Sequence, residues 1–178
     1  LMLFGASLAY GLAGTLNMPL LAQRLEGASC VWLYVAFLFF LVGMGVEAAF
    51  FPLHTWLPDA HSAAPTPIST MLSGIVIEIG FYALAKVLLV LFYQSAFLWQ
   101  AILASLCVAN MLVGSLSALV QRDVKRLLAY SSVANVGYLM AALASCGVRT
   151  LSAAFFFVLS HALSKGLAFL CAGHMATR

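Results

Sequence analysis

Charge is scarce in this chain of 178 residues. Only 7% of the residues are charged, whereas roughly a quarter are charged in an ordinary soluble domain. Hydrophobic residues make up 65% of the chain. They form runs of about 20 residues, the length that an α-helix needs to cross a bilayer. The alternation of apolar and polar residues that a membrane β-barrel requires is missing. The composition therefore predicts an integral, multi-pass helical membrane protein.

Cysteines are few, and no cofactor motif surrounds them. The four thiols, Cys30, Cys107, Cys146 and Cys171, form no C-x-x-C pair and lack the spacing of iron–sulfur ligands. We expect them to pack as small buried hydrophobes. Three further candidates for a metal site, His54, Asp59 and His61, match no familiar ligand spacing. We therefore expect no metal, no cofactor and no catalytic residue in this chain.

Six apolar segments predict about six transmembrane helices in one bundle. They are residues 1–21, 30–53, 67–93, 98–120, 126–146 and 151–172. Short polar turns join most of them, so consecutive helices should be antiparallel neighbours. The chain starts inside an apolar run without the basic segment of a signal peptide, and we expect it to be a fragment of a longer protein.

Basic residues are distributed unevenly between the two ends of the predicted helices. One end carries Arg122, Lys125, Arg126 and Arg178, and the other carries Arg24 and Arg149, with Lys86 close to a helix end. The positive-inside rule then predicts that the loop at residues 121–126 is cytoplasmic. We expect the inner membrane of a prokaryotic cell, with an organellar inner membrane as the alternative.

A cluster of prolines follows the second predicted helix. Four of the five prolines lie there, namely Pro52, Pro58, Pro65 and Pro67. Proline interrupts a helix and Trp56 suits the membrane interface, so we expect an ordered re-entrant or interfacial elbow. Just upstream, Gly43 and Gly45 weaken the helix. Together these residues predict a discontinuous helix near Gly43 to Glu47.

Four ionisable side chains are expected at membrane depth: Glu47, Glu78, His161 and Lys165. A charge at the centre of an inserted helix costs about 2.5 to 3.5 kcal/mol, and intramembrane charges therefore tend to mark ion or proton paths. His161 and Lys165 are four residues apart and share a helix face. A histidine one turn from a lysine suits a proton relay. Structural roles stay open, such as a carboxylate that caps a half-helix at Glu47.

Other polar residues are expected to support these groups. Ser131, Asn135 and Tyr138 fall on one helix face, where they either bond to a neighbouring helix or hold water. Lys86 follows Glu78 by eight residues and is rotated from it by about 80° around the helix axis. It either extends to the interface or supports the relay.

Three stretches resemble a known family. They are FPLHTWLPDAHSAAPTPIS from Phe51, DVKRLLAYSSVANVGYL from Asp123 and SHALSKGLAFLCAG from Ser160. In this order they resemble the antiporter-like proton-translocating subunits of respiratory complex I, whose superfamily includes subunits of membrane-bound hydrogenases and multi-subunit cation/proton antiporters. The resemblance implies two inverted five-helix repeats, each with a broken helix. Residues 1–97 would belong to the first repeat, and residues 98–178 would begin the second.

The resemblance also implies a function and a set of partners. Glu47 would lie at the broken helix and Glu78 in the next helix, while His161 and Lys165 would bridge two half-channels. Protons would move along this midplane relay, coupled to electron transfer in partner subunits that carry iron–sulfur clusters with a flavin or a nickel–iron centre.

The acids at two of these positions depart from the resemblance. Complex I relatives usually carry lysine or histidine where Glu47 and Glu78 stand, so hydrogenase-type and antiporter-type relatives fit at least as well. Two alternatives therefore stay open. One is a sodium/proton antiporter subunit, in which the two carboxylates would bind Na⁺. The other is a scaffold subunit that does not pump.

Overall fold

The structure, a computed structural model, describes residues 1–25, 31–92 and 96–176, and the regular elements within these residues are helices. Four of the described helical spans are long and apolar enough to cross a membrane: Thr66–Leu91, Trp99–Val120, Val124–Ala144 and Val148–Met175. Met2–Ala13 and Val31–Glu47 are shorter apolar helices. The predicted all-α membrane bundle is confirmed.

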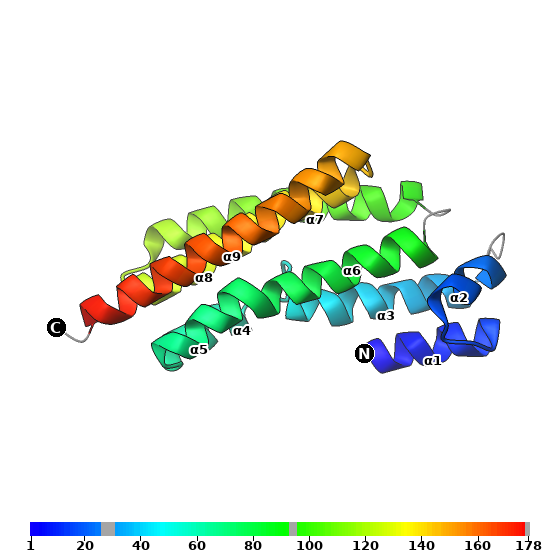
Figure 1. Ribbon diagram of the computed structural model, residues 1–178, viewed down its shortest axis with the longest axis horizontal. Coiled ribbons are helices and arrows are strands. Elements are labelled where there is room, and N and C mark those ends of the chain that lie inside the picture. Colours follow the sequence, from blue (N-terminus) through cyan, green and yellow to red (C-terminus); the bar gives the residue numbers. More distant parts are fainter. Residues whose placement is uncertain (26–30, 93–95, 177–178) are drawn as a thin grey trace.

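The last three predicted helices lie close to their expected positions. They are α7 (Ala96–Val120), α8 (Val124–Ala144) and α9 (Val148–Ala176). In Figure 1, α7 and α8 run side by side along their lengths and α9 packs on α8. The carboxylate of Asp123 caps α8 by accepting a hydrogen bond from the backbone N–H of Lys125 at 2.9 Å.

The first predicted helix, residues 1–21, is wrong as a single element. It consists of α1 (Met2–Ala13) and α2 (Met18–Leu25). Gly14 ends α1 in the left-handed conformation, with φ of 67°, and its N–H bonds to the carbonyl of Tyr10 at 2.6 Å. Glycine adopts this conformation without steric cost, which makes it the usual residue after a helix end.

The second predicted helix, residues 30–53, ends before its predicted end. α3 runs from Val31 to Glu47 and then stops. The N–H of Ala49 bonds to Val46 O at 3.2 Å and the N–H of Phe50 bonds to Gly45 O at 2.8 Å. This pair of bonds, with a left-handed Ala49 (φ of 55°), is a Schellman motif. The helix is therefore interrupted at Glu47, at the end of the predicted range.

The predicted effect of the two glycines is wrong. Gly43 and Gly45 lie within the continuous part of α3. A Cβ atom on Gly43 would lie 2.7 Å from Met2 Cγ, and one on Gly45 would lie 3.2 Å from Phe50 Cδ2. The glycines let neighbouring groups approach the helix closely, and the end of α3 is set by the bonds after Glu47.

The proline-rich elbow contains two short helices, α4 (Trp56–Ala63) and α5 (Thr66–Met71). Pro58 and Pro67 lie in the first turns of these helices, where a missing N–H costs no intrahelical bond, so their expected helix-breaking effect is wrong. Two side chains of α8 bond to the elbow. Arg126 pairs with Asp59 at 2.9 Å, and Lys125 Nζ donates to Ala64 O at 2.9 Å.

A π-helical turn, η1 (Leu72–Val76), joins α5 to α6 (Ile77–Leu91). Gly80 lies roughly halfway along the Thr66–Leu91 span, and a Cβ atom there would lie 2.7 Å from the amide nitrogen of Ala48. The end of α3 is thus level with the middle of a membrane-spanning helix. Figure 1 shows α3 alongside α6 and stopping short of α5.

The cysteines only partly match their prediction. Cys107 is buried, Cys146 is half-buried and Cys171 is exposed, so the expectation is wrong for Cys171. Cys171 lies beside the exposed Leu170 on α9. A small apolar residue gains little by facing inward when the outer surface of a membrane helix is also in an apolar medium. Cys30 and Arg178 lie outside the described residues.

Candidate functional site

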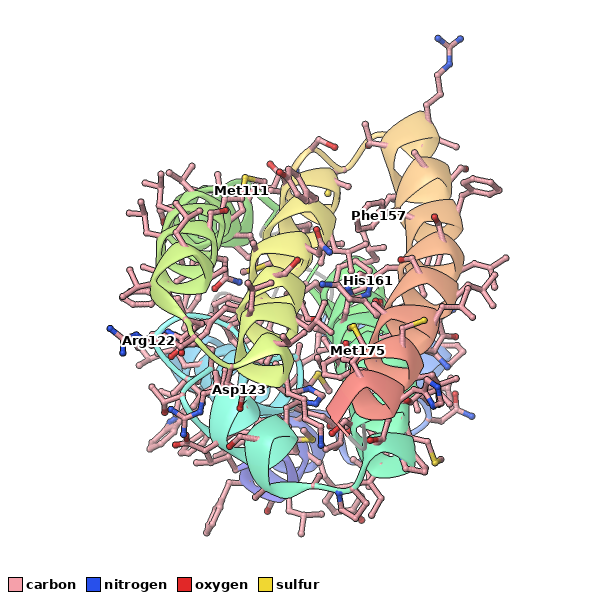
Figure 2. All side chains as sticks on the ribbon, turned by 90° about the vertical axis from the view of Figure 1, so that its left-hand side faces the viewer. Met111, Arg122, Asp123, Phe157, His161 and Met175 are labelled. Atoms are coloured by element: carbon pink, nitrogen blue, oxygen red, sulfur yellow. The ribbon has the colours of Figure 1, made fainter. Side chains whose placement is uncertain are left out.

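The carboxylate of Glu78 and the imidazole of His161 form a buried pair between α6 and α9. His161 Nδ1 lies 2.5 Å from Glu78 Oε1, and the two residues are 3% and 5% exposed. Both lie in the interior of helices long enough to span a membrane. Figure 2 shows His161 on the side of α9 that faces the rest of the bundle. The structure therefore joins two of the four predicted site residues directly.

The outer atoms of this pair are also buried. Glu78 Oε2 and His161 Nε2 have no hydrogen-bond partner among the described residues. Buried polar atoms normally find partners, in the protein or in ordered water. The pair therefore has one free polar atom on each side through which it can be extended.

Lys165 lies one helical turn beyond His161 on α9 and bonds to α8. Its ammonium donates to Ser131 Oγ at 2.7 Å and to the carbonyl of Leu128 at 3.2 Å. Lys165 is only 7% exposed. The ammonium of Lys165 is thus bound by neutral oxygen atoms, and no carboxylate of the described residues contacts it. It can therefore change its charge without breaking an ion pair.

The predicted polar stripe of α8 lines a cavity. Ser131, Asn135 and Tyr138 line it together with Ser115 of α7 and with apolar residues of α7 and α8, and this cavity, which is open to the outside of the bundle, has a volume of about 450 Å³. This space is adequate for several water molecules and has polar groups to bind them. Ser131 thus contacts both the cavity and the ammonium of Lys165.

Glu47 and Lys86 are not part of this contact network. Glu47 is half-buried at the end of α3, and no hydrogen bond or ion pair of its side chain is found within the described part of the chain. Its backbone nonetheless touches Gly80, two residues after Glu78. Lys86 is exposed on α6, without contact to the Glu78–His161 pair.

Asn110 of α7 is a site residue that the sequence analysis missed. It is fully buried, its Oδ1 accepts the N–H of Phe51 at 2.6 Å, and its Nδ2 donates to Met140 Sδ at 3.1 Å. The chain after α3 has lost its helical acceptors, and Asn110 replaces one of them. An asparagine in an otherwise apolar helix was the available signal, although nothing in it identified the distant N–H.

His61 of α4, considered above only as a metal ligand, has surroundings that the sequence analysis did not predict. It is fully buried against Phe169, with ring centroids 4.5 Å apart, and both of its ring nitrogens lack partners among the described residues. Burial lowers the pKa of His61 to about 4, and the positive charges of Lys125 and Lys165 act in the same direction. His61 is therefore a neutral imidazole between the surface elbow and Lys165.

Burial also lowers the pKa of His54, which contacts the rings of Phe51 and Tyr130. His54 Nδ1 is buried without a partner in the described structure. Within the described residues, no group of three or more His, Cys, Asp or Glu side chains is placed to hold a metal ion. The polar groups of the site are thus arranged for hydrogen bonds and ion pairs.

A helical membrane bundle with an interrupted helix and ionisable groups at membrane depth has the architecture of the antiporter-like membrane subunits. The chain belongs to the family described as NADH:quinone oxidoreductase/Mrp antiporter, TM, whose model matches residues 1–178. It is 38% identical over 174 residues to NADH-quinone oxidoreductase subunit N of Desulforudis audaxviator, covering 96% of this chain and 35% of that protein. The chain thus spans about a third of the length of the curated relatives it matches.

Two solved complexes contain chains with the same fold. A chain of the membrane-bound sulfane sulfur reductase, an archaeal respiratory membrane complex, superposes with a TM-score of 0.88 at 37% identity, over 97% of this chain and 36% of that one. A chain of the Mrp complex of a Dietzia species gives a TM-score of 0.88 at 28% identity, over 97% of this chain and 32% of that one. The chain is therefore similar to subunits of multi-subunit membrane complexes.

Proposed function

We propose that this chain is part of a membrane subunit that translocates protons through Glu78, His161 and Lys165, with Glu47 at the interrupted helix. The observation that carries the proposal is the buried Glu78–His161 contact of 2.5 Å, one helical turn from Lys165. Charges at membrane depth are costly and usually functional. A carboxylate, an imidazole and an amine in sequence can each gain and lose a proton.

The relay extends toward the elbow. Lys165 contacts Leu128 near the start of α8, and His61 lies on the same side, stacked on Phe169 one turn further along α9. In the other direction, Ser131, Asn135 and Tyr138 would order water in the cavity beside Lys165. Protons would pass between the midplane pair and the loop at residues 121–126, which we propose to be cytoplasmic.

The partners follow from the relatives. Their names describe a quinone oxidoreductase, a sulfane sulfur reductase and an Mrp complex. For this chain we propose an assembly of several membrane subunits in a prokaryotic inner membrane, with residues 1–97 and 98–178 in two inverted repeats. Electron transfer would take place in partner subunits that carry iron–sulfur clusters with a flavin or a nickel–iron centre.

Proton translocation by the intact complex in proteoliposomes tests the proposal. Glu78→Gln and Lys165→Leu should each reduce proton uptake per turnover at least tenfold, because each removes a group that carries the proton. Arg149→Gln, which removes an exposed charge at the opposite end of α9, is the matched control and should leave uptake unchanged. Undiminished uptake in both relay variants would overturn the proposal and favour a scaffold role.

A sodium/proton antiporter subunit is the second candidate. It is favoured by Glu47, an acid without a basic partner among the described residues, at a helix end where backbone carbonyls gather. Carboxylate and carbonyl oxygens are suitable ligands for hard cations such as Na⁺. Sodium uptake by the complex that disappears in Glu47→Gln would support this candidate, and transport indifferent to sodium would exclude it.

A further inference from the structure

Two buried serines connect α8 to the π-helical turn that precedes Glu78. Ser73 of η1 and Ser132 of α8 are both fully buried, and their hydroxyl oxygens lie 2.8 Å apart. Ser132 Oγ also lies 3.1 Å from the carbonyl of Leu128. A serine hydroxyl has a single hydrogen, so Ser132 donates to Leu128 O and accepts the hydrogen of Ser73.

The carbonyl of Leu128 is the point where this connection meets the candidate relay. It accepts from Ser132 Oγ and also from the ammonium of Lys165, at 3.2 Å. Hydrogen bonds that share an acceptor or follow one another polarise each other. A change in the charge or position of Lys165 therefore alters the bond that Ser132 makes, and through it the bond of Ser73.

The π turn sets the direction in which Glu78 points. A π turn has i→i+5 bonds and so holds one residue more than an α-helical turn, which changes the rotation of all later residues by about 100°. Glu78 follows η1 by two residues. The extra residue thus fixes whether the carboxylate faces His161.

Contacts from outside hold this turn in place. Isolated π turns are rare, and this one is packed against α9 and is joined to α8 by the hydrogen bond between Ser73 and Ser132. A Cβ atom on Gly74 would lie 3.2 Å from the carbonyl of Ala162, next to His161. The Ser73–Ser132 bond is the side-chain hydrogen bond that ties η1 to α8 in the described structure.

We propose that Ser132 is a positioning residue that couples the Lys165 ammonium to the π turn of Leu72–Val76 and so holds Glu78 in register with His161. Ser73 is its partner in this role. The inference rests on the proposed relay for its functional meaning. It also predicts that Ser132 affects the surroundings of the Glu78 carboxyl group, and this effect can be measured without a transport assay.

Infrared spectroscopy and proton uptake of the intact complex test the two parts together. The carboxyl band of Glu78 is identified as the one that Glu78→Gln removes. Ser132→Ala should shift this band and lower proton uptake at least fivefold, whereas Ser132→Thr, which keeps the hydroxyl, should retain both. Ser105→Ala is the matched control, because within the described residues the Ser105 hydroxyl bonds to carbonyls of its own helix, those of Ala101 and Ile102.

Ser73→Ala removes the other half of the bond and provides a second variant if Ser132→Ala does not assemble. The double variant should be no worse than Ser132→Ala alone, because Ser132→Ala already removes the bond to Ser73. An unshifted Glu78 band and normal uptake in Ser132→Ala and Ser73→Ala would overturn the inference. If Glu78→Gln itself leaves uptake intact while Ser132→Ala shifts the band, the inference stands and the proposed function fails.

Discussion

Glu78 and His161 meet at 2.5 Å although 83 residues separate them in the chain. The contact joins α6 to α9 in the interior of two helices long enough to span a membrane, and neither side chain has another hydrogen-bond partner among the described residues. Each group therefore relies on the other to replace hydrogen bonds that it would make with water, because its surroundings cannot solvate it.

Glu78→Leu should lower the free energy of unfolding by about 1 to 3 kcal/mol, because it leaves His161 Nδ1 buried without a partner. Adding His161→Leu should recover part of this loss, since no polar atom is then left unpaired. Thermal unfolding of the purified complex in detergent measures both values. A double variant as unstable as the sum of the two single variants would show that the pair does not interact.

Gly80→Ala should destabilise the packing of α3 on α6. The new Cβ atom would lie 2.7 Å from Ala48 N and 3.0 Å from the carbonyl carbon of Glu47, so the backbone has to move, at a cost of about 1 to 3 kcal/mol. Gly11→Ala is the matched control, because a Cβ atom there meets nothing within 4 Å. It should stabilise α1 by about 0.5 to 1 kcal/mol. Equal melting temperatures for the two variants would contradict this prediction.

Asn110→Leu should loosen the non-helical chain at residues 48–55. The N–H of Phe51 would lose its acceptor inside the membrane, which costs about 1 to 3 kcal/mol. Ser105→Ala removes a polar group from the same helix without touching the Phe51 N–H and serves as the control. Hydrogen exchange of the Phe51 amide, followed by mass spectrometry of the corresponding peptide, should accelerate in the leucine variant only.

Ala49→Gly should stabilise the protein by about 0.5 to 1 kcal/mol, because glycine adopts the left-handed conformation at φ of 55° without the strain of an L side chain. Ala48→Gly is the control, since Ala48 has no positive φ and gains only flexibility. It should destabilise by a similar amount. Denaturation midpoints compare the two variants, and a loss of stability in Ala49→Gly would refute the strain argument.

His61 should make stability depend on acidity. Its pKa is about 4 in the folded protein, below the ordinary value of 6.5, so the unfolded chain binds more protons between these values. The contribution is fully present above pH 6.5 and is lost as the pH falls toward 4, on the order of 3 kcal/mol in total. His61→Phe should flatten the pH profile of the melting temperature in this window.

The spanning helices could be predicted because an apolar run of sufficient length has few alternatives in a membrane. The same hydrophobicity gave no signal for the split after Ala13, since the break depends on one glycine, Gly14, and the Asn17 turn that follows. The interruption of α3 was predicted, although the glycines and the two prolines Pro58 and Pro67 do not cause it. Its position at Glu47 depends on backbone bonds that the glycines upstream did not indicate.

The ionisable site residues were recognisable because charge is rare in this chain. Their pairing was not, because the Glu78–His161 contact depends on how α6 and α9 are rotated, and the π turn that sets this rotation has no sequence signature. The burial of His61 and the role of Asn110 were not predicted, for a related reason. The burial of His61 and the bond from the Phe51 N–H to Asn110 both depend on tertiary structure.

The end of α3 halfway across the bundle also has an electrical consequence. The partial negative charge of the last peptide dipoles of α3 and the carboxylate of Glu47 lie at the same depth, and together they favour the presence of one positive charge. A positive charge that reaches this depth has crossed about half of the membrane voltage, which corresponds to about 1.2 kcal/mol for each 100 mV. For an ion that stops at Glu47, one steep voltage step would become two smaller ones.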